Sequence, residues 1–100
     1  MSDSIPTLSL VQENRDEILA IAAKYGVENV RIFGSVARGD ATSKSDVDLV
    51  ATFPDRFTLV KWGSLLSELE DLLAYPVQIV NETNLRKELR ESIIEGARPL

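Results

Sequence analysis

The residues best suited to chemistry lie in one segment, residues 34–49, which reads GSVARGDATSKSDVDL. Asp46 and Asp48 stand two positions apart, so on a β-strand they share a face with Cα atoms about 6.5–7 Å apart. Two carboxylates at that distance repel by roughly 2.4 kcal/mol at an effective dielectric constant of about 20. Open water, a basic partner or a divalent cation must offset this repulsion. Because Mg²⁺ takes carboxylate and phosphate oxygens together, the pair is a candidate metal site, and a solvated strand face is its plain alternative.

A candidate phosphate site precedes the two aspartates. Gly34 and Ser35 directly follow a predicted strand, and backbone N–H groups and a hydroxyl at such a turn can hold phosphate oxygens. The alternative is a plain turn in which Ser35 caps a short helix. Arg38 can donate to a triphosphate as a charged group, or it can pair with Asp40 or Asp46. Gly34, Ser35 and Arg38 are therefore candidate nucleotide-binding residues.

The composition limits which chemistry is available to the chain. There is no cysteine and no histidine, which excludes disulfides, thiolate or histidine metal sites and Ser-His-Asp hydrolysis. Sixteen acidic residues against eleven basic ones leave a formal charge of −5, which argues against direct nucleic-acid binding. Any reaction must therefore use carboxylates, hydroxyls, Arg or Lys, with a hard metal ion as a further option.

The elements that must position these residues follow from the hydrophobic pattern. A first helix, capped by Thr7 or Ser9, ends at Gly26; strands are expected at residues 30–33, 46–53 and 77–80, and further helices at residues 58–73 and 85–95. The 100 residues are predicted to form a single domain, residues 1–100. The fold class is α+β, a small mixed sheet of about three strands with helices packed on one face.

Two of the helices carry more detailed expectations. In the helix over residues 58–73 the inner stripe is predicted to consist of Leu59, Trp62, Leu65, Leu66, Leu69, Leu72 and Leu73. Trp62 is expected in the core, with a partner-binding anchor as the alternative. The last helix is expected to start with Asn84 as its cap and to bury Leu85, Leu89 and Ile93.

Nothing in the sequence predicts secretion or membrane insertion. Residues 1–6 are polar and lack the regions of a signal peptide, and no apolar run approaches the roughly 20 residues of a membrane helix. We therefore expect a soluble, cytoplasmic protein with no membrane association.

The joint pattern is more specific than its parts. A strand, Gly34-Ser35, ten residues and then Asp-x-Asp entering an apolar strand resembles the signature of the DNA polymerase beta-like nucleotidyltransferase superfamily. The short length and the ARGDA stretch make the chain look most like the minimal nucleotidyltransferases, or MNT proteins. The resemblance implies transfer of a nucleoside monophosphate from ATP to a hydroxyl, with release of pyrophosphate and use of two Mg²⁺ ions. It also implies that Gly34 and Ser35 hold the terminal phosphates, and that the catalytic Asp46 and Asp48 coordinate the metal.

One position departs from the family pattern. The family usually has a third carboxylate on the next strand, where this chain has Val77-Gln78-Ile79-Val80. Gln78 brings no charge and cannot act as a base, so the second metal or activation of the acceptor is in doubt. The chain either tolerates the loss or binds nucleotide with little turnover, unless Gln78 is merely a polar strand residue.

The resemblance also implies a partner. For minimal nucleotidyltransferases this is typically a helical HEPN-domain toxin ribonuclease, neutralised by the MNT protein as antitoxin through complex formation and AMP transfer to a tyrosine. The expected function is therefore that of an adenylyltransferase antitoxin. The alternatives are a binding protein that neutralises its partner by masking alone, which Gln78 favours, and an enzyme that modifies a small molecule.

Overall fold

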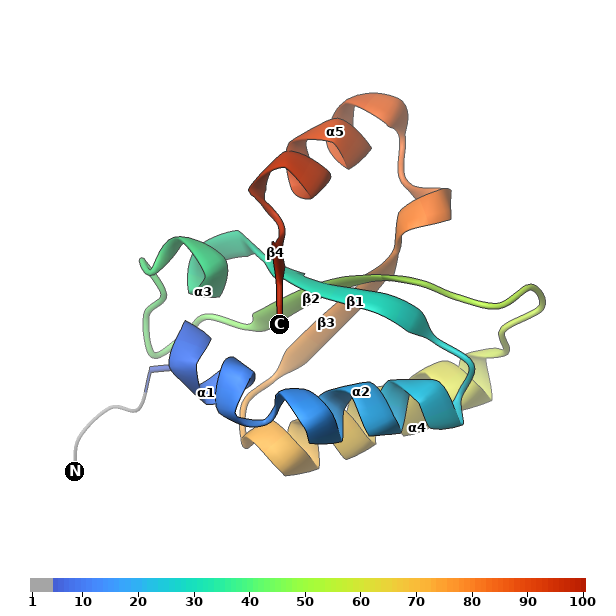
Figure 1. Cartoon of the computed structure of the whole chain (residues 1–100), viewed down its shortest axis with the longest axis horizontal. Helices are drawn as coiled ribbons and strands as arrows, with labels where there is room; N and C mark the ends of the chain where they lie inside the picture. Colours follow the sequence, from blue (N-terminus) through green and yellow to red (C-terminus); the bar gives the residue numbers. More distant parts are fainter. Residues whose placement is uncertain (1–4) are drawn as a thin grey trace.

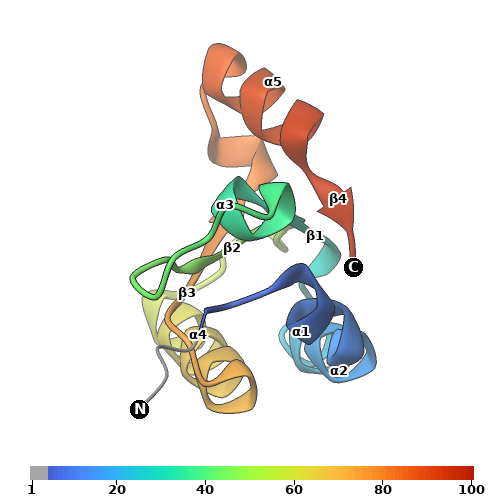
Figure 2. The same ribbon diagram turned by 90° about the vertical axis from the view of Figure 1, so that its left-hand side faces the viewer.

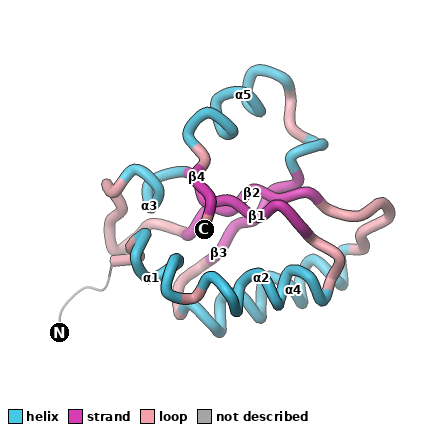
Figure 3. The backbone as a smooth tube through the Cα atoms, viewed as in Figure 1, coloured by secondary structure: helices cyan, strands magenta, loops and turns pink. Residues whose placement is uncertain are grey.

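The computed structural model describes residues 5–100 and places a mixed sheet between two groups of helices (Figure 1). The elements in chain order are α1 (Leu8–Glu13), α2 (Arg15–Lys24), β1 (Glu28–Phe33), α3 (Gly34–Arg38), β2 (Val47–Thr52), α4 (Leu59–Leu73), β3 (Val77–Asn81), the 3₁₀ turn η1 (Glu82–Asn84), α5 (Lys87–Gly96) and β4 (Arg98–Pro99). The strand order is β3-β2-β1-β4, with β2 and β3 parallel and the other two pairs antiparallel. Figure 3 marks the strands in magenta along the backbone. This confirms the α+β class and the mixed sheet.

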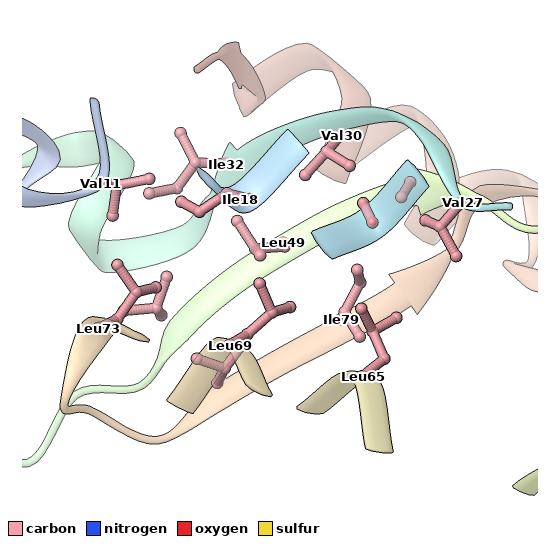
Figure 4. Close-up of a cluster of buried hydrophobic side chains, with 14 of the residues drawn as sticks. Val11, Ile18, Val27, Val30, Ile32, Leu49, Leu65, Leu69, Leu73 and Ile79 are labelled. Atoms are coloured by element: carbon pink, nitrogen blue, oxygen red, sulfur yellow. The ribbon is translucent and has the colours of Figure 1, made fainter. Parts of the chain in front are cut away.

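The hydrophobic core lies between the sheet and the layer formed by α1, α2 and α4. Its α4 contribution is Leu65, Leu69 and Leu73, each 0–2% exposed, which pack toward Leu49 and Ile79 of the sheet (Figure 4). These leucines recur every four residues, so they form one stripe along α4. Each fully buried leucine contributes about 1.5–3 kcal/mol relative to an exposed one.

Two residues of the predicted α4 stripe behave differently from each other. Leu59 is 90% exposed, so the expectation that it lies in the core is wrong: it is the first residue of α4, beyond the end of the buried stripe. Trp62 stacks on Phe53, with ring centroids 4.7 Å apart, and meets Phe57 edge-on. The expectation of a packed Trp62 is confirmed, and this ring is not a free anchor for a partner.

The N-terminal helix predicted in one piece is two helices, α1 and α2. Thr7 caps α1 by accepting a hydrogen bond from the backbone N–H of Leu10, as expected. Asn14 separates the helices: its side-chain amide donates to the carbonyl of Leu10 at 2.8 Å. Asparagine side chains compete with helical backbone bonds in this way, which is why the chain turns at this residue.

The C-terminal region differs most from expectation. Asn84 lies in η1 and does not cap α5, which begins at Lys87 with no side-chain cap. No residue of α5 is fully buried, and Leu89 is 53% exposed, so the expectation that Leu89 is buried is wrong, whereas Leu85 and Ile93 are half-buried. The helix lies on the side of the sheet opposite α2 and α4, as Figures 1 and 2 show, rather than with α1, α2 and α4. β4, a strand of two residues that adds a fourth member to the sheet, was not predicted.

The second face of the sheet, on the α5 side, is polar near its α3 end. Strand register aligns Phe33, Asp48 and Gln78 in one row across β1, β2 and β3, and Arg31 and Val50 with Val80 in the next. Residues paired across strands point to the same side. We refer to this side as the open face. Among residues 5–100, no helix is both long and apolar enough to cross a membrane.

Candidate nucleotide site

The Gly-Ser turn and the second aspartate lie against each other at the end of β1. Gly34 has φ +77°, in the left-handed region that glycine tolerates best. A Cβ atom at this position would lie 2.4 Å from Oδ2 of Asp48 and 3.2 Å from its Cγ. Only glycine therefore allows β1 to pass directly into α3 while the Asp48 carboxylate lies beside the turn. The candidate phosphate turn and the second aspartate of the candidate metal pair therefore lie side by side.

The serine of this motif does not cap α3. The helix begins at Gly34, with Phe33 as its N-cap and no side-chain capping bond. Ser35 lies inside the first turn and is half-buried. A phosphate contact thus stays a prediction for Ser35, whereas the simpler role of helix cap does not apply.

The two aspartates form an electrostatically strained pair. Asp46 lies one residue before β2, and Asp48 is the second residue of that strand. Partial burial raises the pKa of the Asp48 carboxyl, and the nearby charge of Asp46 raises this pKa further, while Arg38 opposes both. The structure therefore brings the two carboxyl groups within electrostatic range, as the spacing predicted. A bound cation would relieve the repulsion.

Arg38 lies at the edge of the same site. Its Nε donates to Oδ2 of Asp40 at 3.2 Å, and both side chains are more than 60% exposed. Pairing with Asp40 was one of the two predicted alternatives for Arg38. An exposed pair of this kind contributes at most about 1 kcal/mol, so a phosphate group can displace Asp40 at little cost.

A cleft of about 250 Å³ opens between α3 and α5 beside this arginine. It is lined by Phe33, Gly34, Arg38, Ser92, Ile93 and Gly96. Sequence reasoning placed Ile93 on the inner face of this helix but did not connect it with the site, and it missed Ser92 and Gly96 because no motif marks them.

Gln78 lies where the missing third carboxylate was expected. It pairs in register with Asp48 on the neighbouring strand, and its side chain is exposed. The amide therefore shares the open face with Asp48. The equivalence of Gln78 with the third acid of the family, and its effect on turnover, stay predictions.

An ion-pair network on the open face, also missed from the sequence, connects α5 to the sheet. Glu82 of η1 accepts from Arg31 of β1 at 2.8 Å, and Arg90 of α5 lies 3.7 Å from the same carboxylate. Arg31 and Glu82 are only 17% and 16% exposed, so this pair is better shielded than the surface pair at Arg38. Charges separated by 51 positions in the chain leave no local pattern that could predict such a network.

The donor set fits a hard cation shared with a phosphate. Asp46 and Asp48 offer carboxylate oxygens of the type that Mg²⁺ prefers. No group of three or more His, Cys, Asp or Glu residues able to hold a metal occurs within residues 5–100. Asp46 and Asp48 would hold such an ion, and water and substrate oxygens would supply its other ligands, as is usual for magnesium at phosphates.

Comparison with known proteins gives consistent results. Residues 15–100 match the family model of the nucleotidyltransferase domain. MntA of Thermococcus cleftensis, named a protein adenylyltransferase, is 32% identical over 71 residues, covering 71% of this chain and 72% of the relative. A provisionally named protein adenylyltransferase of Methanocaldococcus jannaschii is 30% identical over 87 residues, covering 87% of this chain and 94% of the relative.

Solved structures share the fold. A provisionally named minimal nucleotidyltransferase superposes with a TM-score of 0.83 at 40% identity, covering 94% of this chain and 96% of that one. A toxin–antitoxin structure with AMP-PNP has a TM-score of 0.73 at 18% identity, covering 85% and 70%. The structure of a tri-AMPylated HEPN toxin of Shewanella oneidensis in complex with MNT antitoxin has a TM-score of 0.66 at 17% identity, covering 87% of this chain and 68% of that one. With the motif, the fold and these matches in agreement, the chain belongs to the minimal nucleotidyltransferase family.

Proposed function

We propose that this chain is a Mg²⁺-dependent protein adenylyltransferase that acts as an antitoxin by transferring AMP from ATP to a tyrosine of a HEPN-domain toxin. The observation that carries the proposal is the contact between Gly34 and Asp48, with Asp46 beside them. The relatives named protein adenylyltransferases support the reaction class. The fold shared with a HEPN–MNT complex supports the partner.

The reaction balances without an oxidant or a further reactant. The tyrosine oxygen forms a bond to the α-phosphorus of ATP, and the bond from that phosphorus to the oxygen bridging to the β-phosphate breaks. Pyrophosphate leaves with the electron pair, and the phenol proton is released to solvent. Magnesium, when bound, neutralises charge on the phosphoryl oxygens and on the leaving group.

The residues of the site divide this work. Asp46 and Asp48 would hold the metal beside the α-phosphate, and their mutual repulsion favours the cation-bound state. Backbone N–H groups at Gly34 and the Ser35 hydroxyl would orient the terminal phosphates, and Arg38 would supply a positive charge to the departing pyrophosphate. This set requires neither histidine nor cysteine, in agreement with the composition.

The order of residues across the open face suggests where the acceptor enters. Attacking and leaving oxygens lie roughly in line through the α-phosphorus. With the leaving group on the α3 side of Asp48, the acceptor hydroxyl approaches from the opposite side, where Gln78 pairs with Asp48. An uncharged amide there can hydrogen-bond the phenol but cannot remove its proton.

The test uses the chain together with a HEPN-domain toxin, ATP and Mg²⁺. The intact mass of the partner is expected to rise by whole adenylate units, and the rise is expected to disappear with Asp46→Asn or Asp48→Asn. A complex that forms without any adenylate gain would overturn the enzymatic proposal. It would support the second candidate, neutralisation by masking alone, for which the uncharged Gln78 beside Asp48 is the specific observation.

A further inference from the structure

We propose that α5 forms the second wall of the triphosphate site, and that Ser92 contacts the terminal phosphates in the cleft between α3 and α5. The proposal rests on the proposed function and deepens it, because it assigns substrate contacts to a helix outside the Gly-Ser and Asp-x-Asp motif. It starts from the cleft of about 250 Å³ that Phe33, Gly34 and Arg38 share with Ser92, Ile93 and Gly96.

The charge of the cleft favours an anion. The chain as a whole has a formal charge of −5, yet the residues lining this cleft include Arg38 and no carboxylate. Ser92 adds a hydroxyl donor from the opposite wall. A cation, a hydroxyl and glycine backbone around one small space are groups that bind phosphate oxygens.

The location of the cleft selects the terminal phosphates over the rest of the nucleotide. Gly34 belongs both to the cleft lining and to the contact with Asp48, so the cleft begins where the α-phosphate would lie beside the carboxylates. Arg38 lines the same cleft as Gly34, so its guanidinium belongs to the wall next to the contact between Gly34 and Asp48. A chain of phosphates that starts at Asp48 and passes Gly34 therefore enters the space between Arg38 and Ser92.

Polar contacts help to position α5, in addition to the half-buried Ile93 and Ile94. The helix has no buried residue, and Arg90 connects it to Glu82, which is bound in turn to Arg31 of β1. Glu82 therefore acts as a positioning residue for the α5 wall. Loss of its charge is expected to alter the width of the cleft without removing any group that touches the nucleotide.

The first experiment compares ligands that contain or lack the terminal phosphates. The full chain is titrated with ATP, pyrophosphate and AMP, each with Mg²⁺. Ser92→Ala is expected to lower the affinity for ATP and for pyrophosphate by about five- to tenfold. AMP binding is expected to change less than twofold. Ser67→Ala, an exposed serine on α4, is the matched control and is expected to leave all three affinities unchanged.

A second variant fills the cleft instead of removing a contact. Gly96 lines the cleft, and a Cβ atom there would meet nothing within 4 Å, so Gly96→Leu is compatible with the fold. Gly96→Leu is expected to lower the affinity for ATP and for pyrophosphate by more than tenfold, while the melting temperature stays unchanged. Gly63→Leu on α4, where a Cβ also has open space, is the control. Glu82→Gln is expected to raise the KM for ATP several-fold while kcat stays within twofold.

Each result decides the inference. Wild-type affinity for ATP in both Ser92→Ala and Gly96→Leu would overturn it, and so would equal losses for ATP and AMP, which would place the nucleoside in the cleft. A selective loss of ATP and pyrophosphate would support it even if no adenylate reached the partner, in which case the proposed function alone would fail. Transfer at the wild-type rate and wild-type KM by both variants would leave the proposed function standing and remove this inference.

Discussion

The two faces of the sheet are built on different principles. The face toward α2 and α4 is held by apolar side chains such as Leu49, Ile79 and Leu69, which are 0–2% exposed. The open face carries Asp48 and Gln78 in one row and Arg31 in the next, where Glu82 binds it. Under the proposed function, one face provides stability and the other provides reactivity, so we expect substitutions on the two faces to separate these properties.

The largest expected effect is on activity from the open face. Asp48→Asn removes a carboxylate but keeps the shape of the side chain, and we expect AMP transfer to fall at least about 10²–10³-fold, or about 3–4 kcal/mol in the barrier. Intact-mass measurement of the HEPN partner over time provides the rate. Activity within tenfold of the wild type would show that Asp48 is not at the reacting centre.

The corresponding substitution on the core face should affect stability alone. Leu69→Ala removes a side chain that is 0% exposed, and the cost is about 2–5 kcal/mol, visible in chemical denaturation. Leu59→Ala, on the same helix but 90% exposed, is the control and should change stability by less than about 0.5 kcal/mol. Equal losses from both would contradict the burial pattern of α4.

These two substitutions also show how much the sequence could predict. The leucine stripe of α4, the strand at β2 and the meeting of Gly34 with Asp48 follow from periodicity and from the motif, which are local signals. The placement of α5 does not, because it depends on Glu82 finding Arg31 across 51 positions and because no buried stripe marks the helix. The cleft beside Ser92 was missed for the same reason.

The third prediction concerns the junction of the two faces at α3. Gly34→Ala places a Cβ atom 2.4 Å from Asp48 Oδ2 at a positive φ, so we expect a loss of about 1–3 kcal/mol in stability together with a large loss of transfer. Gly39→Ala is the matched control: its φ is +82°, but a Cβ there meets nothing within 4 Å. It should cost only the backbone strain, about 1 kcal/mol, and should leave transfer intact. If the two variants have identical activities, the close contact between position 34 and Asp48 does not matter for transfer.

A smaller effect is expected from restoring the third carboxylate. Gln78→Asp places an acid beside Asp48 in the register of β2 and β3, and we expect the concentration of Mg²⁺ that gives half-maximal transfer to fall several-fold. Gln78→Asn keeps an uncharged amide and is the control for side-chain length. If Gln78→Asp leaves the Mg²⁺ dependence unchanged, the row Phe33–Asp48–Gln78 does not define the metal site.

The smallest effect distinguishes two carboxylates on opposite sides of the sheet by the sign of their pH dependence. Burial and Asp46 raise the pKa of Asp48, whereas hydrogen bonds from Lys24 and Tyr25 lower the pKa of Glu68 on α4. Ionisation of Asp48 therefore lowers the stability of the folded chain as the pH rises above the ordinary aspartate pKa of about 3.9. Ionised Glu68 contributes stability that is present above its ordinary pKa, about 4.3, and is lost as pH falls through its lowered folded-state pKa.

The measurement is a set of thermal melts of the metal-free chain between pH 3 and pH 7. Asp48→Asn is expected to have the same melting temperature as the wild type at pH 3. At pH 7 it is expected to melt a few degrees higher, which corresponds to a gain in stability of at most about 1 kcal/mol. Added Mg²⁺ should reverse this difference. Glu68→Gln is expected to melt below the wild type at pH 7, with the difference shrinking at pH 3. The difference in melting temperature between variant and wild type should change with pH in opposite directions for the two variants. Changes of the same sign would contradict the comparison of the two faces, because ionisation should destabilise the protein at Asp48 and stabilise it at Glu68.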